Sequence, residues 1–201
     1  MATIDFIFDV GSPNAHLAHK VLPGVAQRTG ATVRIVPCLL GGIFKATGNQ
    51  APMIAFGNIK NKMPYEMRET QRFIRDHAIA GFTMNPHFPV NTLLMMRMLA
   101  SAEIDGGLDT LAAALLRHMW EAPKKMDDPA VVAAALKESG FDAERLMARA
   151  QEVDAKARLL ANTEAAVERG AFGIPTFFVG DEMFFGKDKL RDVEAEVRRA
   201  G

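Results

Sequence analysis

Ser12 is the residue whose position in this chain best suits the binding of an anion. It follows the strand-like run 3–9 and precedes Pro13, and a serine before a proline is a strong signal for the start of a helix. The unpaired backbone N–H groups and the dipole at a helix N-terminus stabilise a nearby negative charge. A serine hydroxyl there can donate a hydrogen bond to a bound thiolate and help to keep it ionised near neutral pH. The plain alternative is that Ser12 only caps its helix.

The second stretch with chemical meaning is 170–180, which contains the dipeptide Ile174-Pro175. The dipeptide stands directly before the β-prone run 176–179, and glycines punctuate both sides. A bond that precedes proline is the only peptide bond that adopts the cis form at low cost. A cis bond here would turn the backbone of Ile174 outward, towards an extended ligand, whereas a trans proline would simply begin an edge strand. If the helix start at Ser12 faces this loop, both belong to one site, and we expect the cis form.

Other reactive side chains give weaker signals. His16 and His19 are three residues apart and could share a helix face, but no third ligand stands out and no metal site is predicted. We expect a solvated or half-buried polar face for them. Cys38 is the only cysteine, which excludes an intramolecular disulfide, a Cys-x-x-Cys redox pair and a multi-cysteine zinc site. Cys38 is expected to lie in the core.

The elements that must position these residues form three blocks. The runs 3–9 and 32–37 are predicted strands on either side of a predicted helix over 14–29, which makes a parallel βαβ unit. From residue 39 the strand signal disappears for more than a hundred residues, and helical patterns follow, the last of them a single long helix over 142–169. Two short strands, 176–179 and 183–185, and a helix over 188–199 end the chain.

Neither terminal block can bury a sheet alone, so the two must pair. The predicted fold is therefore α/β, with a thioredoxin-like four-stranded mixed sheet and an all-helical insertion domain. Residues 1–38 and 170–201 would form the discontinuous thioredoxin-like domain, and 39–169 the helical insertion domain.

Composition narrows the class of partner. The chain has 201 residues, of which 49% are hydrophobic and 24% charged, and its formal net charge is zero. That balance removes the electrostatic attraction on which binders of nucleic acid or of anionic membranes rely. No signal-peptide pattern is present, and no run approaches the ~20 apolar residues of a membrane span. We predict a cytoplasmic protein that binds neither nucleic acid nor membrane.

Several motifs together point to a known family. They are Phe8-Asp9-x-x-Ser12-Pro13, Gly48-Asn49, Phe88-Pro89-x-Asn91-Thr92-Leu93, the run 173–179, and Phe184-Phe185-Gly186-x-Asp188-x-Leu190. In matching order, and over essentially the full chain, this set resembles the DsbA-like family of 2-hydroxychromene-2-carboxylate isomerases and kappa-class glutathione transferases. Singly these motifs are modest, and jointly they are specific.

The resemblance implies a homodimer that binds glutathione between the thioredoxin domain and the helical insertion. Ser12 stands where the family's serine contacts the glutathione sulfur, and Ile174, before Pro175, stands where backbone groups pair with the cysteinyl part. The remaining matches are Asp188 with Lys187 for the γ-glutamyl end, and Asn49 and Lys62 (or its neighbour Lys60) in the first part of the insertion.

Two positions depart from the family pattern. His16 stands where members usually have an aromatic residue, often tyrosine, and Asn14-Ala15 is smaller and more polar than the usual pair. Both positions fall beside the pocket for the second substrate, so Asn14 and His16 are candidates for its lining.

The activity that the resemblance implies is a glutathione-dependent isomerisation of 2-hydroxychromene-2-carboxylate to trans-o-hydroxybenzylidenepyruvate in aromatic catabolism. Such a protein needs to stabilise and position only a thiolate that arrives with glutathione, so one serine suffices. Two alternatives stay open: a kappa-type glutathione transferase or peroxidase, and a non-enzymatic thioredoxin scaffold that binds glutathione or a peptide.

Overall fold

A four-stranded mixed sheet forms the centre of the computed structural model, which describes residues 2–200. The strand order is β2-β1-β3-β4. The first pair is parallel and the other two pairs are antiparallel. The predicted α/β class and the four-stranded mixed sheet are therefore confirmed. The strands are β1 (Thr3–Phe8), β2 (Thr32–Pro37), β3 (Thr176–Val179) and β4 (Glu182–Phe185).

The two central strands supply the core of the sheet. All residues of β1 except Thr3 are buried, and so are all four residues of β3. Phe6 of β1 lies opposite Phe177 of β3, and their rings stack with centroids 5.3 Å apart. Cross-strand aromatic pairs of this kind add stability beyond the area that they bury, and here the pair joins the N-terminal and C-terminal blocks of the chain.

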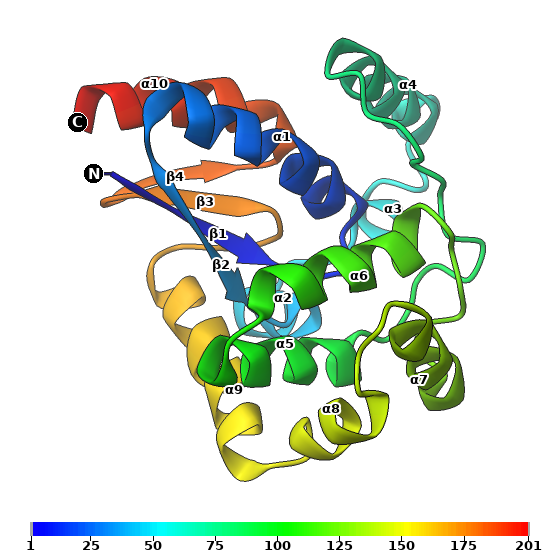
Figure 1. Ribbon diagram of the computed structural model, residues 1–201. Coiled ribbons are helices and arrows are strands. Elements are labelled where there is room, and N and C mark those ends of the chain that lie inside the picture. The colour runs from blue at the N-terminus through cyan, green and yellow to red at the C-terminus, as the bar shows by residue number, and fades with distance from the viewer. Residues whose placement is uncertain (1, 201) are drawn as a thin grey trace.

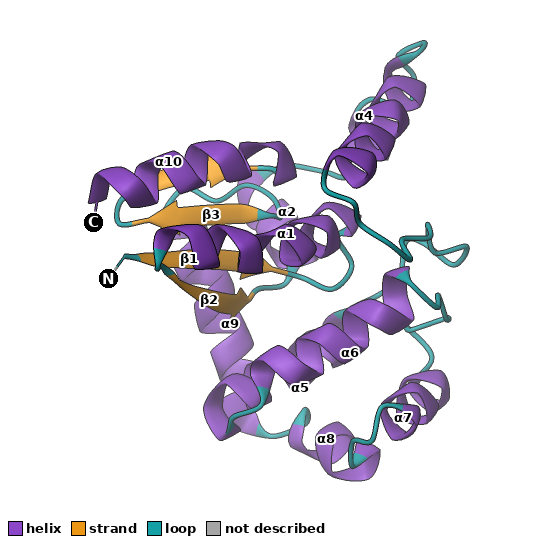
Figure 2. Ribbon diagram, turned by 45° about the horizontal axis from the view of Figure 1, so that its top comes forward, coloured by secondary structure: helices purple, strands orange, loops and turns teal. Residues whose placement is uncertain are grey.

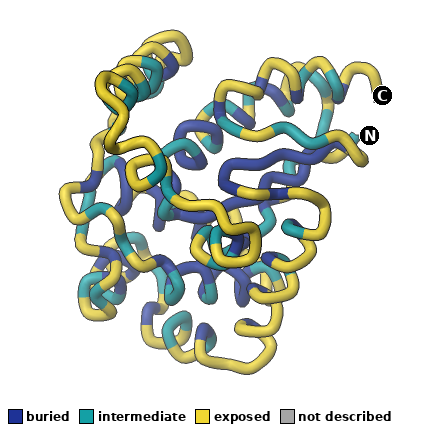
Figure 3. The backbone as a smooth tube through the Cα atoms, turned by 180° about the vertical axis from the view of Figure 1, so that it is seen from behind, coloured by how far each residue is buried: buried dark blue, intermediate teal, exposed yellow. Residues whose placement is uncertain are grey.

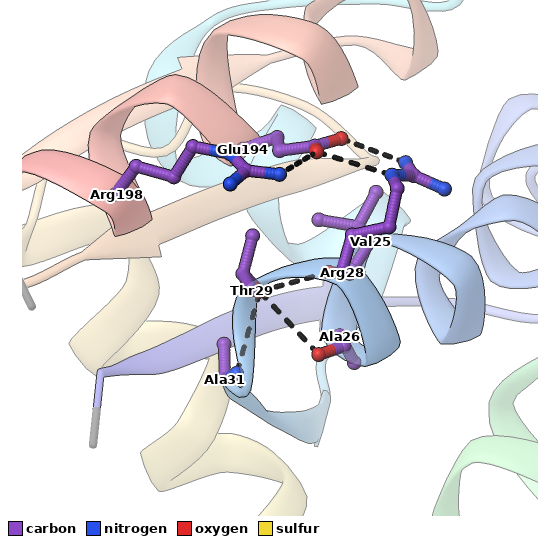
Figure 4. Close-up of polar contacts among 7 residues, drawn as sticks. All are labelled: Val25, Ala26, Arg28, Thr29, Ala31, Glu194 and Arg198. Carbon is purple, nitrogen blue, oxygen red and sulfur yellow. Dashed lines mark hydrogen bonds and ion pairs between the residues drawn. The ribbon is translucent and has the colours of Figure 1, made fainter.

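Helices cover both faces of this sheet. On one face α1 (Pro13–Thr29) and α10 (Leu190–Ala200) lie side by side (Figure 1). Arg28 of α1 makes two hydrogen bonds to Glu194 of α10, at 3.1 and 2.7 Å, and Arg198 adds a third at 2.8 Å (Figure 4). Because these charges are largely exposed, the buried apolar contacts between the two helices contribute more than the ion pairs do.

The remaining helices come from the middle of the chain. Among them α9 and α5 pack together against β2, with α9 on the opposite side of the sheet from α1, and α6 to α8 gather around α5 (Figures 1 and 2). They are α2 (Leu40–Thr47), α3 (Pro52–Ala55), α4 (Lys62–Asp76), α5 (Leu93–Asp105), α6 (Leu108–Trp120), α7 (Pro129–Glu138), α8 (Ala143–Arg149) and α9 (Val153–Glu168). A short 3-10 helix, η1 (Lys187–Lys189), precedes α10.

The single helix predicted over 142–169 is wrong, because the structure divides it into α8 and α9. Glu152 has an extended backbone, so the chain turns before α9 begins. Arg149 at the end of α8 bonds to Asp154 in the first turn of α9 and also to Asp105 of α5. These long-range contacts fasten a break that the local helical pattern does not show.

Residues 50–77, which we call the arm, pack least against the rest of the molecule. The arm contains α3 and α4, and α4 stands away from the other helices (Figure 2). Phe73 is the only residue of α4 that is buried, and the backbone of the arm is largely exposed (Figure 3). Its large apolar side chains that are exposed are those of Met53, Ile54, Phe56, Ile59, Tyr65 and Met67.

Within residues 2–200, no helix has the length and apolar character needed to cross a membrane. The same residues hold no group of three or more His, Cys, Asp or Glu side chains arranged to bind a metal ion.

Candidate functional site

Ser12 and Ile174, which are 162 residues apart in the chain, meet in the structure. Ser12 is the N-cap of α1, and its Oγ accepts a hydrogen bond from Ala15 N at 3.2 Å. The same hydroxyl donates to the carbonyl oxygen of Ile174 at 3.1 Å. The first turn of α1 holds no acidic residue, so no side-chain charge there opposes an anion at the helix start. The two chemical signals of the sequence therefore belong to one place.

The proline loop, which we define as residues 172–175, is held at every carbonyl. The Ile174–Pro175 peptide bond is cis, the isomer that the sequence leads us to expect. Four successive carbonyl oxygens accept hydrogen bonds, from Asn49 Nδ2 to Phe172 (2.7 Å), Thr176 Oγ1 to Gly173 (2.7 Å), Ser12 Oγ to Ile174 (3.1 Å) and Gly186 N to Pro175 (2.9 Å). Buried carbonyls need such partners, and these donors come from four separate parts of the fold.

An aromatic pair that the sequence reasoning missed borders this loop. The rings of Phe172 and Phe185 have centroids 4.5 Å apart, and both side chains are partly exposed. Gly173 lies beneath them, and a Cβ at that position would come within 2.8 Å of the Phe185 ring. A larger residue at position 173 would therefore require the Phe185 ring to shift. Phe185 lies in the motif 184–190, so its sequence position offered a signal that went unused.

Asp9 is a second residue that the sequence reasoning missed. Its side chain is fully buried at the end of β1. One carboxylate oxygen accepts from Gly11 N at 2.8 Å, and the other accepts from Leu40 N at 2.8 Å and from Thr92 Oγ1 at 3.1 Å. Burial raises the pKa of this carboxyl, and the three hydrogen bonds act in the opposite direction. Asp9 thus ties the loop before Ser12 to the start of α2 and to the N-cap of α5.

His16 lies one helical turn after Ser12 and is fully buried, so the expectation of a solvated or half-buried face is wrong for this residue, whereas His19 is half-buried as expected. His16 is buried because residues from the middle of the chain cover its ring. The ring stacks on Phe82 with centroids 5.9 Å apart, and Glu121 lies 3.9 Å from Nε2. Neither ring nitrogen has a hydrogen-bond partner among the described residues. Burial, assisted by the charge of Lys20, lowers the pKa of His16 to about 4, so the imidazole is neutral at pH 7.

Asn14, the other candidate for the substrate pocket, is half-buried in the first turn of α1. Cys38 is buried as expected, and its Sγ donates to Asn162 O at 3.3 Å. Burial raises the pKa of the Cys38 thiol far above neutral pH. Because the thiolate is the reactive form, the only cysteine of the chain is inert, and any thiolate at Ser12 must arrive with a ligand.

The residues expected to hold the γ-glutamyl end lie at η1. Lys187 is buried, and its ammonium bonds to both carboxylate oxygens of Asp188 at 2.8 and 3.1 Å. The same ammonium lies 5.0 Å from the centroid of the Phe73 ring in the arm. Asp188 itself is exposed. The ammonium of Lys187 is therefore paired with groups of the same chain. Of the two residues, Asp188 is the one that faces solvent.

Lys62 and Asn49 lie in different surroundings. Lys62, in the first turn of α4, pairs with Glu66 at 2.6 Å and lies 5.6 Å from the centroid of the Phe56 ring. Within the described residues it makes no hydrogen bond or ion pair with Ser12 or the proline loop. Asn49, by contrast, bonds directly to that loop. The structure therefore gathers Ser12, Ile174, Pro175 and Asn49, and keeps Lys62 within the arm.

The chain is similar to known proteins over nearly its whole length. Residues 3–198 match the family model described as a DSBA-like thioredoxin domain. The chain is 30% identical to a 2-hydroxychromene-2-carboxylate isomerase of Pseudomonas putida, over 98% of this chain and 94% of that protein. It is 25% identical to the human (Homo sapiens) glutathione S-transferase kappa 1, over 94% of this chain and 87% of that protein.

A solved structure of a 2-hydroxychromene-2-carboxylate isomerase superposes with a TM-score of 0.80 at 28% identity and covers 98% of this chain and 95% of its own. The order β-α-β, helical block, β-β-α is thus that of a DsbA-like thioredoxin fold. The relatives named here are enzymes by their names. The chain belongs to the DsbA-like thioredoxin domain family, in the group that contains the 2-hydroxychromene-2-carboxylate isomerases and the kappa glutathione transferases.

Proposed function

We propose that this protein is a glutathione-dependent isomerase of the 2-hydroxychromene-2-carboxylate type. The observation that carries the proposal is the Ser12 hydroxyl at the N-terminus of a 17-residue helix, in contact with the Ile174 carbonyl and with no thiol of the chain available. A site that stabilises a thiolate but supplies none suits a reaction in which the nucleophile is brought by a cofactor. The small aromatic acid would be the substrate.

Each residue at the site has a role that follows from its chemistry. Bound glutathione would supply a thiolate that adds reversibly to the conjugated carbon of the hydroxychromene acid and leaves after ring opening and bond rotation. The Ser12 hydroxyl would donate a hydrogen bond to the sulfur, and the start of α1 favours the negative charge. Ile174 offers its backbone to the cysteinyl unit, next to Pro175.

The charged end of the ligand has a suitable place at η1. Glutathione carries an α-ammonium group, and Asp188 is an exposed carboxylate whose neighbour Lys187 is already bonded to it. We assign the α-ammonium to Asp188 and give Lys187 the role of holding that carboxylate in place. Asn49 would act on the same ligand through the proline loop. Lys62 belongs to the arm, which with Asn14 would face the aromatic acid, and the buried His16 would lie behind that pocket.

The kappa-type glutathione transferase is the second candidate, because the same thiolate could attack an electrophile and remain bonded to it in the product. The human relative of that name supports it. Two assays separate the candidates: ultraviolet monitoring of hydroxychromene acid conversion with and without glutathione, and conjugation of chlorodinitrobenzene. Conversion that requires glutathione supports the isomerase. Conjugation without conversion makes the protein a transferase, and tight glutathione binding with neither activity makes it a scaffold.

We further propose that two copies of the chain associate as a homodimer in the cytoplasm and act in aromatic catabolism. Light scattering on the purified protein checks the first point, with an expected mass twice that of one chain. A monomeric mass at the concentrations used for the assays would remove the homodimer from the proposal while leaving the chemistry intact.

A further inference from the structure

The single hydroxyl proton of Ser12 is engaged in a hydrogen bond to Ile174. A hydroxyl donates one hydrogen bond, and this one goes to Ile174 O at 3.1 Å. Ser12 and Ile174 are both buried, with exposed fractions of 4% and 7%. The proton that the proposed function assigns to a glutathione thiolate is therefore already in use.

We propose that ligand binding exchanges this hydrogen bond: the Ser12 hydroxyl turns from the Ile174 carbonyl to the thiolate, and an N–H of the ligand takes its place on Ile174. This inference rests on the proposed function and concerns how that site selects an ionised ligand. The exchange leaves neither the Ser12 hydroxyl nor the Ile174 carbonyl without a partner. The ligand brings one acceptor, the sulfur, and one donor, the cysteinyl N–H, and the protein gives up one bond and makes two.

The geometry permits the exchange without movement of the serine oxygen. Ser12 Oγ accepts from Ala15 N at 3.2 Å, and this capping bond fixes the oxygen at the helix start. Only the O–H bond needs to rotate, because the acceptor side of the oxygen keeps its partner. The reorganisation is therefore confined to one hydrogen atom on the protein.

The rest of the proline loop stays held during the exchange. Ile174 is the one loop residue whose carbonyl depends on Ser12, and the carbonyls of Phe172, Gly173 and Pro175 keep their own donors. If Ser12 turned away and no ligand N–H arrived, the buried carbonyl of Ile174 would be left without its donor, which is costly. A ligand must consequently present both groups, a sulfur anion and a backbone N–H, to bind well.

The test compares glutathione with γ-glutamyl-2-aminobutyryl-glycine, an isostere that has a methyl group in place of the thiol. Calorimetry on wild-type protein and on Ser12→Ala gives the dissociation constants of both. Loss of the hydroxyl should weaken glutathione roughly tenfold, because the thiolate loses its donor. The isostere should bind a few times more tightly to the variant, about threefold, because its N–H then restores a donor to the buried Ile174 carbonyl, which the variant leaves unsatisfied.

Opposite shifts for the two ligands support the exchange. Weakening of both ligands together, or an unchanged constant for the isostere, overturns it while the proposed function stands. Failure of wild-type protein to bind glutathione overturns the proposed function and the exchange with it.

Two further variants separate the exchange from loss of the helix cap. Ser12→Gly also lacks the hydroxyl but keeps a residue that is well tolerated at an N-cap, so it should behave like Ser12→Ala with a smaller loss of stability. Ser12→Thr keeps a hydroxyl and should retain the wild-type preference for glutathione over the isostere. The exchange is contradicted if Ser12→Thr has the dissociation constants of Ser12→Ala, or if Ser12→Gly has those of the wild-type protein.

Discussion

Two residues on successive turns of α1 differ in how their polar groups are satisfied. Ser12, at the helix start, both accepts and donates, and every carbonyl of the proline loop has a donor. His16, one turn later, is fully buried with two ring nitrogens that have no partner among the described residues. Burying such groups without partners costs free energy.

The difference separates two tasks within the site. At Ser12 the site is preset, since its donors fix the backbone that the proposed ligand would meet. At His16 the helix carries a buried imidazole, covered by Phe82 and Glu121 from the middle of the chain. Polar groups kept in such an unfavourable state cluster at functional sites, which fits the proposal that His16 lies behind the pocket for the second substrate.

The largest effect is expected from His16, on the free energy of unfolding in the acid range. The folded-state pKa of His16 is about 4 and its ordinary value is 6.5, so the unfolded chain binds more protons between these values. The free energy of unfolding should therefore fall as the pH falls from 6.5 to 4, by about 3 kcal/mol from this group.

Chemical denaturation across that range, on wild type and on His16→Phe, measures this contribution. The pKa values of His19 and His118 are also lowered by burial, so the variant should lose part of the pH dependence and not all of it. If the free energy of unfolding depended on pH identically in the two proteins, His16 would not be a buried neutral group. The contrast between Ser12 and His16 would then disappear.

The next effect is expected on turnover when Ser12 is replaced. Ser12→Ala removes the donor to the thiolate, and turnover should fall roughly 100-fold, as when one donor to a developing anion is removed from other enzymes. Stability should fall by only about 1 kcal/mol, the typical cost of a lost N-cap. Steady-state rates and thermal unfolding on the same preparations check both halves, and near-normal turnover would break the assignment of Ser12.

A smaller effect is expected where Asn49 meets the proline loop. Asn49→Ala removes the donor to Phe172 O, and the loop should become less well ordered at Ile174. We expect the KM for glutathione to rise a few-fold, about 1 kcal/mol, with kcat little changed. The neighbouring Gln50→Ala is a matched control, since only the backbone N–H of Gln50 bonds to Asn49. Equal effects of the two variants would remove the positioning role.

The smallest effect on folding is expected in the arm. Ile54 is 69% exposed, so Ile54→Ser should change the free energy of unfolding of the single chain by less than about 0.5 kcal/mol. A buried counterpart, Leu17→Ala in α1, should cost about 3 kcal/mol in the same denaturation experiment. A large loss in the arm variant would show that this surface is covered in solution.

The parts of the site that local sequence signals define could be predicted. Ser12 is found because a strand, a serine and a proline mark a helix start, and Ile174 because proline precedes a β-prone run. The α/β class followed from the order of these patterns. The predicted division at residues 38/39 and 169/170 stays a prediction. The ligand roles of the predicted site residues also stay predictions: Ser12, Asn14, His16, Asn49, Lys62, Ile174, Pro175, Lys187 and Asp188.

The rest depends on contacts between segments far apart in the chain. The partners of Asp9 come from α2 and α5 as well as from Gly11, and no local pattern announces them. The burial of His16 depends on how the middle of the chain folds over α1, which periodicity does not reveal. The break between α8 and α9 has the same origin, since it is fastened by an arginine that bridges two helices.

The most direct test of the central claim is the ionisation of glutathione bound to the protein. The thiolate absorbs in the ultraviolet, so a pH titration of the complex gives the pKa of the bound thiol. We expect the midpoint for wild type to lie at least about one unit below the ~8.5 of an ordinary thiol, and to return close to that value in Ser12→Ala. The same midpoint in both proteins, at the value of free glutathione, would contradict the account of Ser12 and the start of α1 as a thiolate site.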